Sequence, residues 1–202
     1  HEVNNPNGVI LSRASYLLSI ADEEGLDPDI IDDIEVIELQ SKRVSSVASE
    51  LLSLSSNRQV KIEQINLEEI VNLTAHLLKN LALEHGVAVS CASQTPAYAR
   101  GATLEIEQVC LNILKNAIHS GATEVLAQSS MGSIAITDNG GGVPPEAIKK
   151  IFEPFYTTKS VGKGTGLGLS VSHDIVSALG GRIEVSSGNE GGTTFTIHLP
   201  VD

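Results

Sequence analysis

Polar side chains on one predicted helix have the types and spacing needed to bind a cation and phosphate. On the helix predicted over 104–120, Gln108, Asn112 and Asn116 lie four residues apart and therefore share one face. Carboxamide oxygens can ligate Mg²⁺, which keeps waters and substrate phosphates among its ligands. The adjacent Lys115 can neutralise phosphate charge. Taken alone, an ordinary solvated helix face is the better interpretation of this pattern.

A carboxylate ends the strand predicted over 133–137 and stands directly before three glycines. Asp138 is followed by Asn139, Gly140, Gly141 and Gly142. A carboxylate in this place can accept a hydrogen bond from a ligand amine such as that of adenine, while the glycines let the backbone come close. A plain turn is the alternative, because Asp-Asn-Gly is also a strong turn signal.

Glycines alternate with other residues from Gly162 to Gly168, just before a helix predicted over 169–179. Free backbone amides and the helix N-terminus can face phosphates there. The segment is not a P-loop, since the GxxxxGK pattern is absent. A dinucleotide fingerprint would follow the first strand of a βαβ unit, whereas this segment lies near the chain end. Its length and glycine density predict a mobile lid.

His1, Glu2 and Asn5 form a third group at the other end of the chain. A lone terminal histidine is usually a solvated residue or a tag remnant. Here Glu2 can orient the imidazole or take its proton, which makes a ring nitrogen nucleophilic. Asn5, one helical turn further on, can position a water or a phosphate. We therefore regard His1 as a candidate nucleophile.

Residues 1–57 are predicted to form two helices that carry an apolar seam. Asp27-Pro28 is a stop-and-restart signal between them. Because two helices bury too little for a stable domain, the seam predicts a second copy and a dimeric four-helix bundle. Packing of both helices on the rest of the chain is the alternative. The seam positions are Val3, Asn7, Ile10, Ala14, Leu17 and Ala21 in the first helix and Ile30, Ile34, Ile37, Ser41, Val44, Ala48, Leu51 and Ser55 in the second.

Residues 67–202 have the mixed pattern of an α+β two-layer sandwich. Residues 58–66 are interpreted as a linker that can become a strand at its end. Helices are predicted over 67–81, 104–120 and 169–179. Strands are predicted over 87–91, 124–129, 133–137, 182–186 and 193–199, with a hairpin turn near Met131 and Gly132.

Composition narrows the function further. The chain of 202 residues has a net charge of −12, which argues against a broad nucleic-acid-binding surface because such a surface needs clustered Lys and Arg. Cys91 and Cys110 form no CxxC pair and are interpreted as buried or half-buried thiols of a reduced compartment. No apolar run approaches the roughly 20 residues of a membrane span. The abrupt start at His1 is interpreted as that of a fragment.

Taken together and in this order, the motifs resemble those of sensor histidine kinases of two-component systems. The resemblance covers essentially the whole chain. It rests on 1–6 as the H box, 112–116 as the N box, 138–142 as the first glycine box, 152–155 as the F box and 162–169 as the second glycine box. It implies a homodimeric phosphotransfer hairpin followed by an ATP-binding domain of the histidine kinase type.

The resemblance implies a role for each matching residue. His1 would be the phosphoacceptor, Glu2 its general base and Asn5 the residue that holds water for dephosphorylation of a partner. Further implied roles are Mg²⁺ ligation by Asn116 helped by Asn112, a phosphate contact by Lys115, binding of the adenine amine by Asp138, an adenine pocket shaped by Gly140 and Gly142, and a lid base anchored by Phe152 and Phe155. ATP binding by the lid would involve Lys159, Gly162, Gly164, Thr165, Gly166, Leu167 and Gly168.

Hydrolytic relatives with this ATP-binding fold carry a Glu four residues before the metal-binding Asn, and this chain has Asn112 there. The resemblance therefore favours transfer of the γ-phosphate to His1 and then to an Asp of a response regulator. A phosphatase that acts through Asn5 and a nucleotide-binding scaffold without catalysis are the alternatives. The fragment is expected in the cytoplasm, with a parent protein that is either soluble or membrane-anchored.

Overall fold

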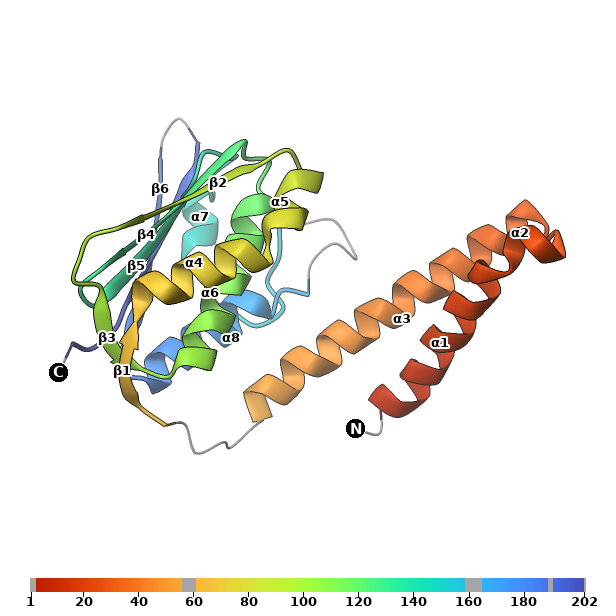
Figure 1. The fold of residues 1–202 in the computed structure, drawn as a ribbon, viewed down its shortest axis with the longest axis horizontal. Coiled ribbons are helices and arrows are strands. Elements are labelled where there is room, and N and C mark those ends of the chain that lie inside the picture. Colours follow the sequence, from red (N-terminus) through yellow and green to blue (C-terminus); the bar gives the residue numbers. More distant parts are fainter. Residues whose placement is uncertain (1–2, 56–60, 159–164, 189–190, 202) are drawn as a thin grey trace. The chain divides into compact units, whose positions relative to one another are not determined.

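The computed structural model describes residues 3–55, 61–158, 165–188 and 191–201. The chain folds into two compact units (Figure 1). A helical hairpin forms the first unit, and an α+β domain forms the second. In the described part of the chain, no helix is long and apolar enough to span a membrane.

The hairpin consists of α1 (Asn4–Ser19), the short α2 (Ala21–Glu24) and α3 (Pro28–Ser55). α2 ends at Gly25, whose φ of 62° is left-handed and suits a residue without Cβ. The Asp27 carboxylate then accepts a hydrogen bond from Asp29 N–H at 2.9 Å, and Pro28 opens α3. The predicted stop and restart at Asp27-Pro28 is thus confirmed.

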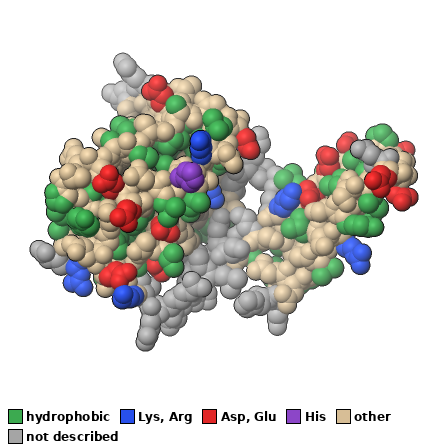
Figure 2. Space-filling view, viewed as in Figure 1, with side chains coloured by type: hydrophobic (Ala, Val, Ile, Leu, Met, Phe, Trp, Pro, Cys, Tyr) green, Lys and Arg blue, Asp and Glu red, His purple; other side chains and the backbone are tan. Residues whose placement is uncertain are grey.

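The seam positions divide into two sets with opposite exposure. The set inside the hairpin is buried and comprises Asn7, Ala14, Ala21, Ile34 and Ser41. The intervening positions Val3, Ile10, Leu17, Ile30, Ile37 and Val44 are between 40 and 56% exposed. Figure 2 shows hydrophobic side chains on the surface of this unit. Over the seam from Val3 to Val44, every second position therefore lies inside the hairpin, while the side chains of Leu51 and Ser55 lie outside the described set.

Polar contacts fix how the two long helices meet. The Asn7 amide Nδ2 donates to the Ser41 carbonyl oxygen at 2.7 Å and to Ser45 Oγ at 2.8 Å. Ser15 Oγ donates to Glu38 Oε1 at 2.6 Å. A buried Asn in a helix seam disfavours other registers of the two helices, because sliding would leave its amide without partners.

The second unit is built on a five-stranded sheet with the order β2-β4-β5-β7-β6. β2 runs parallel to β4, and the other neighbours are antiparallel. β1 and β3 form a separate antiparallel pair. The strands are β1 (Glu63–Asn66), β2 (Ala88–Ser93), β3 (Tyr98–Gly101), β4 (Glu124–Ser130), β5 (Ser133–Asp138), β6 (Arg182–Ser187) and β7 (Thr193–His198).

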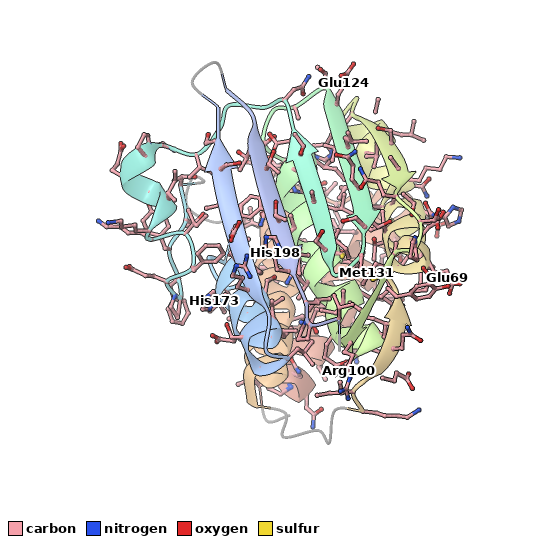
Figure 3. The ribbon with its side chains drawn as sticks, turned by 90° about the vertical axis from the view of Figure 1, so that its left-hand side faces the viewer. Glu69, Arg100, Glu124, Met131, His173 and His198 are labelled. Atoms are coloured by element: carbon pink, nitrogen blue, oxygen red, sulfur yellow. The ribbon has the colours of Figure 1, made fainter. Side chains whose placement is uncertain are left out.

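Helices cover one face of this sheet, and the α+β sandwich expected from the sequence is confirmed (Figures 1 and 3). Ile106, Ile113, Ile134, Ile136 and Ile197 are among the fully buried side chains between the two layers. The helices are α4 (Leu67–Leu77), α5 (Lys79–Glu84), α6 (Thr103–Ile118), α7 (Pro145–Ile148) and α8 (Gly168–Ala178). Figure 3 looks onto the other face, with Met131 at the turn between β4 and β5.

Two details differ from the sequence prediction, and a third agrees with it. The helix predicted over 67–81 is interrupted at Leu78, whose ψ of 5° ends α4 before α5 begins. The short elements β3 and α7 were not predicted. The strand expected at the end of the 58–66 segment is confirmed as β1, whose last residue Asn66 caps α4 by accepting from Glu68 and Glu69 N–H.

The two cysteines differ from each other. Cys110 lies on the buried face of α6, and burial raises its pKa to about 12, so it stays a neutral thiol at ordinary pH. Cys91 lies on the edge strand β2 and is exposed. The interpretation as a buried thiol is therefore correct for Cys110 and wrong for Cys91, because an edge strand has a neighbour on one side only.

Candidate functional site

Asp138 is a buried carboxylate at the C-terminal end of β5. It is 5% exposed. Ser120 Oγ lies 3.1 Å from Asp138 Oδ1, and Gly140 N–H donates to the same oxygen at 2.9 Å. Within the described residues both donors reach Oδ1, which leaves Oδ2 to accept from a ligand. The predicted position at a strand end is confirmed, and the donors make the carboxylate a fixed acceptor.

Gly140 and Gly142 lie where side chains would collide with their neighbours, whereas a Cβ at Gly141 would make only ordinary contact. A Cβ at Gly142 would lie 2.7 Å from Ser187 Oγ. The backbone of Gly192, in the connection between β6 and β7, donates to the Gly140 carbonyl oxygen at 2.6 Å. Two loops that are distant in the sequence therefore pack backbone to backbone beside Asp138, which leaves a wall without side chains.

The carboxamides of α6 stand next to the first turn of α8. Asn112 Nδ2 donates to the Gly168 carbonyl oxygen at 3.3 Å and to Ser172 Oγ at 3.4 Å. Ser172 Oγ in turn donates to Gly168 O at 2.8 Å. Because the amide nitrogen is directed to α8, its oxygen Oδ1 is directed away and can serve as a ligand. Asn116 is half-buried one turn further along α6, and Lys115 is exposed.

The base of the predicted lid is closed by a backbone contact. Phe155 N–H donates to the Gly166 carbonyl oxygen at 3.0 Å. Both residues are left-handed, with φ of 66° at Phe155 and 70° at Gly166. The Phe152 ring is half-buried with its centroid 5.3 Å from that of His173 on α8. Leu167 is 1% exposed, so its side chain packs in the interior and only its backbone can reach a ligand.

Some predicted site residues are not placed by the structure. His1, Glu2, Lys159, Gly162 and Gly164 lie outside the described residues. Of the others, Asn5 is exposed on α1 of the first unit, and Thr165 is half-buried. The residues brought together in the second unit are those of the N box, the first glycine box and the lid base.

Sequence reasoning missed three serines and a glycine pair in this region. Ser120 continues the four-residue spacing of Gln108, Asn112 and Asn116, so the pattern contained a signal for it. Ser172 contacts Asn112, and Ser187 accepts from Val143 N–H at 2.9 Å. Gly191 and Gly192 are recognisable in the sequence as consecutive glycines, although nothing in the sequence connects them with Gly140.

The chain resembles known proteins over its whole length. Residues 101–202 match the family model described as histidine kinase-, DNA gyrase B-, and HSP90-like ATPase. The chain is 32% identical over 209 residues to the sensor histidine kinase ZraS of Salmonella typhimurium, which covers all of this chain and 44% of that protein. It is 32% identical over 216 residues to the two-component sensor PprA of Pseudomonas aeruginosa, and that alignment covers all of this chain and 23% of PprA.

The fold has a counterpart among solved structures. Full-length ShkA, determined in complex with AMPPNP, superposes with a TM-score of 0.80 at 24% identity over 99% of this chain and 44% of that chain. At this identity the likeness concerns the fold alone. The chain spans less than half the length of these curated relatives.

Proposed function

The chain belongs to the histidine kinase-, DNA gyrase B- and HSP90-like ATPase family as the catalytic core of a two-component sensor histidine kinase, and from this membership we propose that it phosphorylates His1 with ATP. The phosphoryl group would then pass to an Asp of a response regulator. The observation that carries the ATP site is Asp138, whose Oδ1 is held by two donors while Oδ2 is left for the adenine amine.

The surroundings of Asp138 support a nucleotide in this place. Glycine backbone lines one side, where a Cβ at Gly142 would meet Ser187. The N-terminus of α8 lies beside Asn112 and offers its dipole to phosphates. Carboxamide oxygens are hard ligands, so Asn116 and Asn112 fit Mg²⁺, which would neutralise charge on the phosphates when bound.

In the proposed transfer, a ring nitrogen of His1 attacks the γ-phosphorus and the bond to the β,γ-bridging oxygen breaks, so that ADP leaves. Glu2 takes the proton that the imidazole loses. The ATP site and His1 must meet for this step. We therefore propose a division into a hairpin over 1–57, a linker over 58–66 and a catalytic domain over 67–202, with hinge motion confined to residues before β1.

Asn112 also supports transfer rather than hydrolysis. A general base that activates water needs a group that takes up a proton, and a carboxamide does not do so at neutral pH. Its nitrogen, moreover, is engaged with Gly168 and Ser172. A nucleophile must then come from elsewhere, and the proposed source is His1 of the hairpin.

The exposed half of the hairpin seam supports a homodimer. Ile10, Leu17, Ile30 and Ile37 repeat at heptad spacing and are at least 40% exposed. A second hairpin placed on this stripe would bury it and form the four-helix bundle predicted from the sequence. Asn5 is exposed on α1, where we propose that it holds the water for dephosphorylating the partner.

The proposed function is tested with γ-labelled ATP and Mg²⁺ on the native chain and on His1→Gln. We expect label that is acid-labile, alkali-stable and absent from the variant. Asn5→Ala, tested against a phosphorylated receiver domain, should lower dephosphorylation while labelling of His1 persists. Binding of ATP without label on the native chain would refute the kinase assignment and favour a phosphatase or a scaffold.

A further inference from the structure

Ser120, one of the two donors to Asp138 Oδ1, lies where the end of α6 meets the first glycine box. Its Oγ is 3.1 Å from Asp138 Oδ1 and 2.8 Å from the Ala117 carbonyl oxygen. Its own carbonyl oxygen accepts from Gly141 N–H at 3.3 Å. Both the side chain and the backbone of this serine therefore connect the helix that carries the carboxamides with the loop that follows Asp138.

Gly140 is shaped to this serine. A Cβ at residue 140 would overlap Ser120 Oγ and lie 2.8 Å from both Ser120 Cβ and its carbonyl oxygen. Gly140 N–H itself donates to Asp138 Oδ1 at 2.9 Å. The missing side chain at 140 thus lets a hydroxyl and an amide reach the same carboxylate oxygen.

The hydroxyl of Ser120 has one hydrogen and two acceptors within reach. An ionised carboxylate is the stronger acceptor, because the bond is charge-assisted. With the hydrogen on the Ala117 carbonyl, a lone pair of Oγ would face the charged Asp138 oxygen at 3.1 Å; with the hydrogen on Oδ1, it faces the neutral Ala117 carbonyl oxygen at 2.8 Å, which carries less negative charge. The favourable arrangement therefore directs the hydrogen to Oδ1, and two donors on one oxygen fix the plane of the carboxylate.

We propose that Ser120 is a positioning residue for base selection, which holds Asp138 so that Oδ2 faces the exocyclic amine of adenine. The proposal rests on the proposed function, because it requires Asp138 to meet the base. Ser120 acts only through Asp138 here. Its loss should weaken recognition of the amine and leave the phosphate contacts unchanged.

The experiment measures binding of two nucleotides with Mg²⁺ to the full chain by competition with a fluorescent ATP analogue. ATP carries the 6-amino group, and purine riboside 5′-triphosphate lacks it. Ser120→Ala should weaken ATP about fivefold to tenfold, in line with loss of a charge-assisted hydrogen bond, and leave purine riboside triphosphate within about twofold. Ser120→Thr, which keeps the hydroxyl, should restore the preference for ATP.

Two controls separate the possible failures. Ser19→Ala removes a serine that also donates to a carbonyl three residues earlier, at 2.7 Å, and it should change neither affinity. Asp138→Asn should abolish the preference for ATP. Equal weakening of both nucleotides by Ser120→Ala, or no change in either, would overturn the positioning role. A native chain that does not prefer ATP, together with an inert Asp138→Asn, would overturn the adenine assignment on which the role depends.

Discussion

Alanine substitution should weaken ATP binding at one of the two glycines that flank Leu167 and not at the other, although both belong to the same glycine box. Gly166 has a φ of 70°, and a Cβ there would lie 2.6 Å from the Phe155 carbonyl oxygen and 2.7 Å from its Cα. Gly168 opens α8, and a Cβ there would lie 3.8 Å from Asn112 Cγ, which is ordinary contact. Gly166→Ala therefore strains the lid base, whereas Gly168→Ala fits.

The cost of Gly166→Ala can be worked from these contacts. A left-handed alanine costs about 1–2 kcal/mol, and displacement of Phe155 breaks its hydrogen bond to Gly166, which contributes about 1 kcal/mol more. A total of about 2–3 kcal/mol corresponds to a loss of about 30-fold or more in ATP affinity, if the lid base must keep this geometry to bind. Gly168→Ala should stay within about twofold of the native affinity.

Competition with a fluorescent nucleotide measures both affinities, and urea unfolding shows whether the strain lowers global stability instead. A loss in either quantity for Gly166→Ala, with neither lost for Gly168→Ala, is the expected result. Equal losses for the two variants would refute the reasoning from backbone geometry. So would a Gly166→Ala chain with native affinity and native stability.

Three further substitutions and a thiol titration test other parts of the molecule. Asn7→Ala should lower the free energy of unfolding by about 1–3 kcal/mol, measured in urea, because two acceptors on α3 lose their donor; an unchanged midpoint would contradict this. Ile37→Glu should convert the proposed dimer to a monomer in sedimentation without loss of helical circular dichroism, and a persistent dimer would place the interface elsewhere. Ser172→Ala should raise the Mg²⁺ concentration needed for half-maximal ATP binding severalfold, while the affinity for nucleotide in excess Mg²⁺ stays the same. In thiol titration Cys91 should react in the native chain, faster as pH rises toward its raised pKa, and Cys110 only after unfolding; early reaction of Cys110 would refute its burial.

The site was predictable from sequence where its signals are local. The i, i+4 spacing placed Asn112 and Asn116 on one face of α6, and a strand followed by glycines placed Asp138 at the end of β5. Both patterns depend on neighbours within a few residues, where helix and strand geometry leave little freedom. The same spacing extended by one step would have found Ser120.

The partners of these residues were not predictable, because they come from distant segments. Ser172 reaches Asn112 only because α8 packs against α6, and Gly192 reaches Gly140 only because β7 pairs with β5. Neither pairing has a signature in the sequence around the residues concerned. The interruption at Leu78, where the backbone has a ψ of 5°, likewise lacks a glycine or proline to announce it.

The seam of the hairpin was predictable in part, because its periodicity is local but its contacts come from a distant helix. Its exposed half also indicates which partner covers it. Periodicity found every seam position but did not indicate which ones face the chain's own second helix. In the structure the inner set is small or polar at Asn7, Ala14, Ala21 and Ser41 and contains one large apolar residue, Ile34, while large apolar side chains such as Ile10 and Ile37 are about half exposed. A hairpin that functioned alone would have the opposite arrangement, since burying an isoleucine contributes about 1.5–3 kcal/mol. Small inner residues let α1 and α3 approach closely, and the larger outer stripe then provides the apolar surface that a second copy would bury.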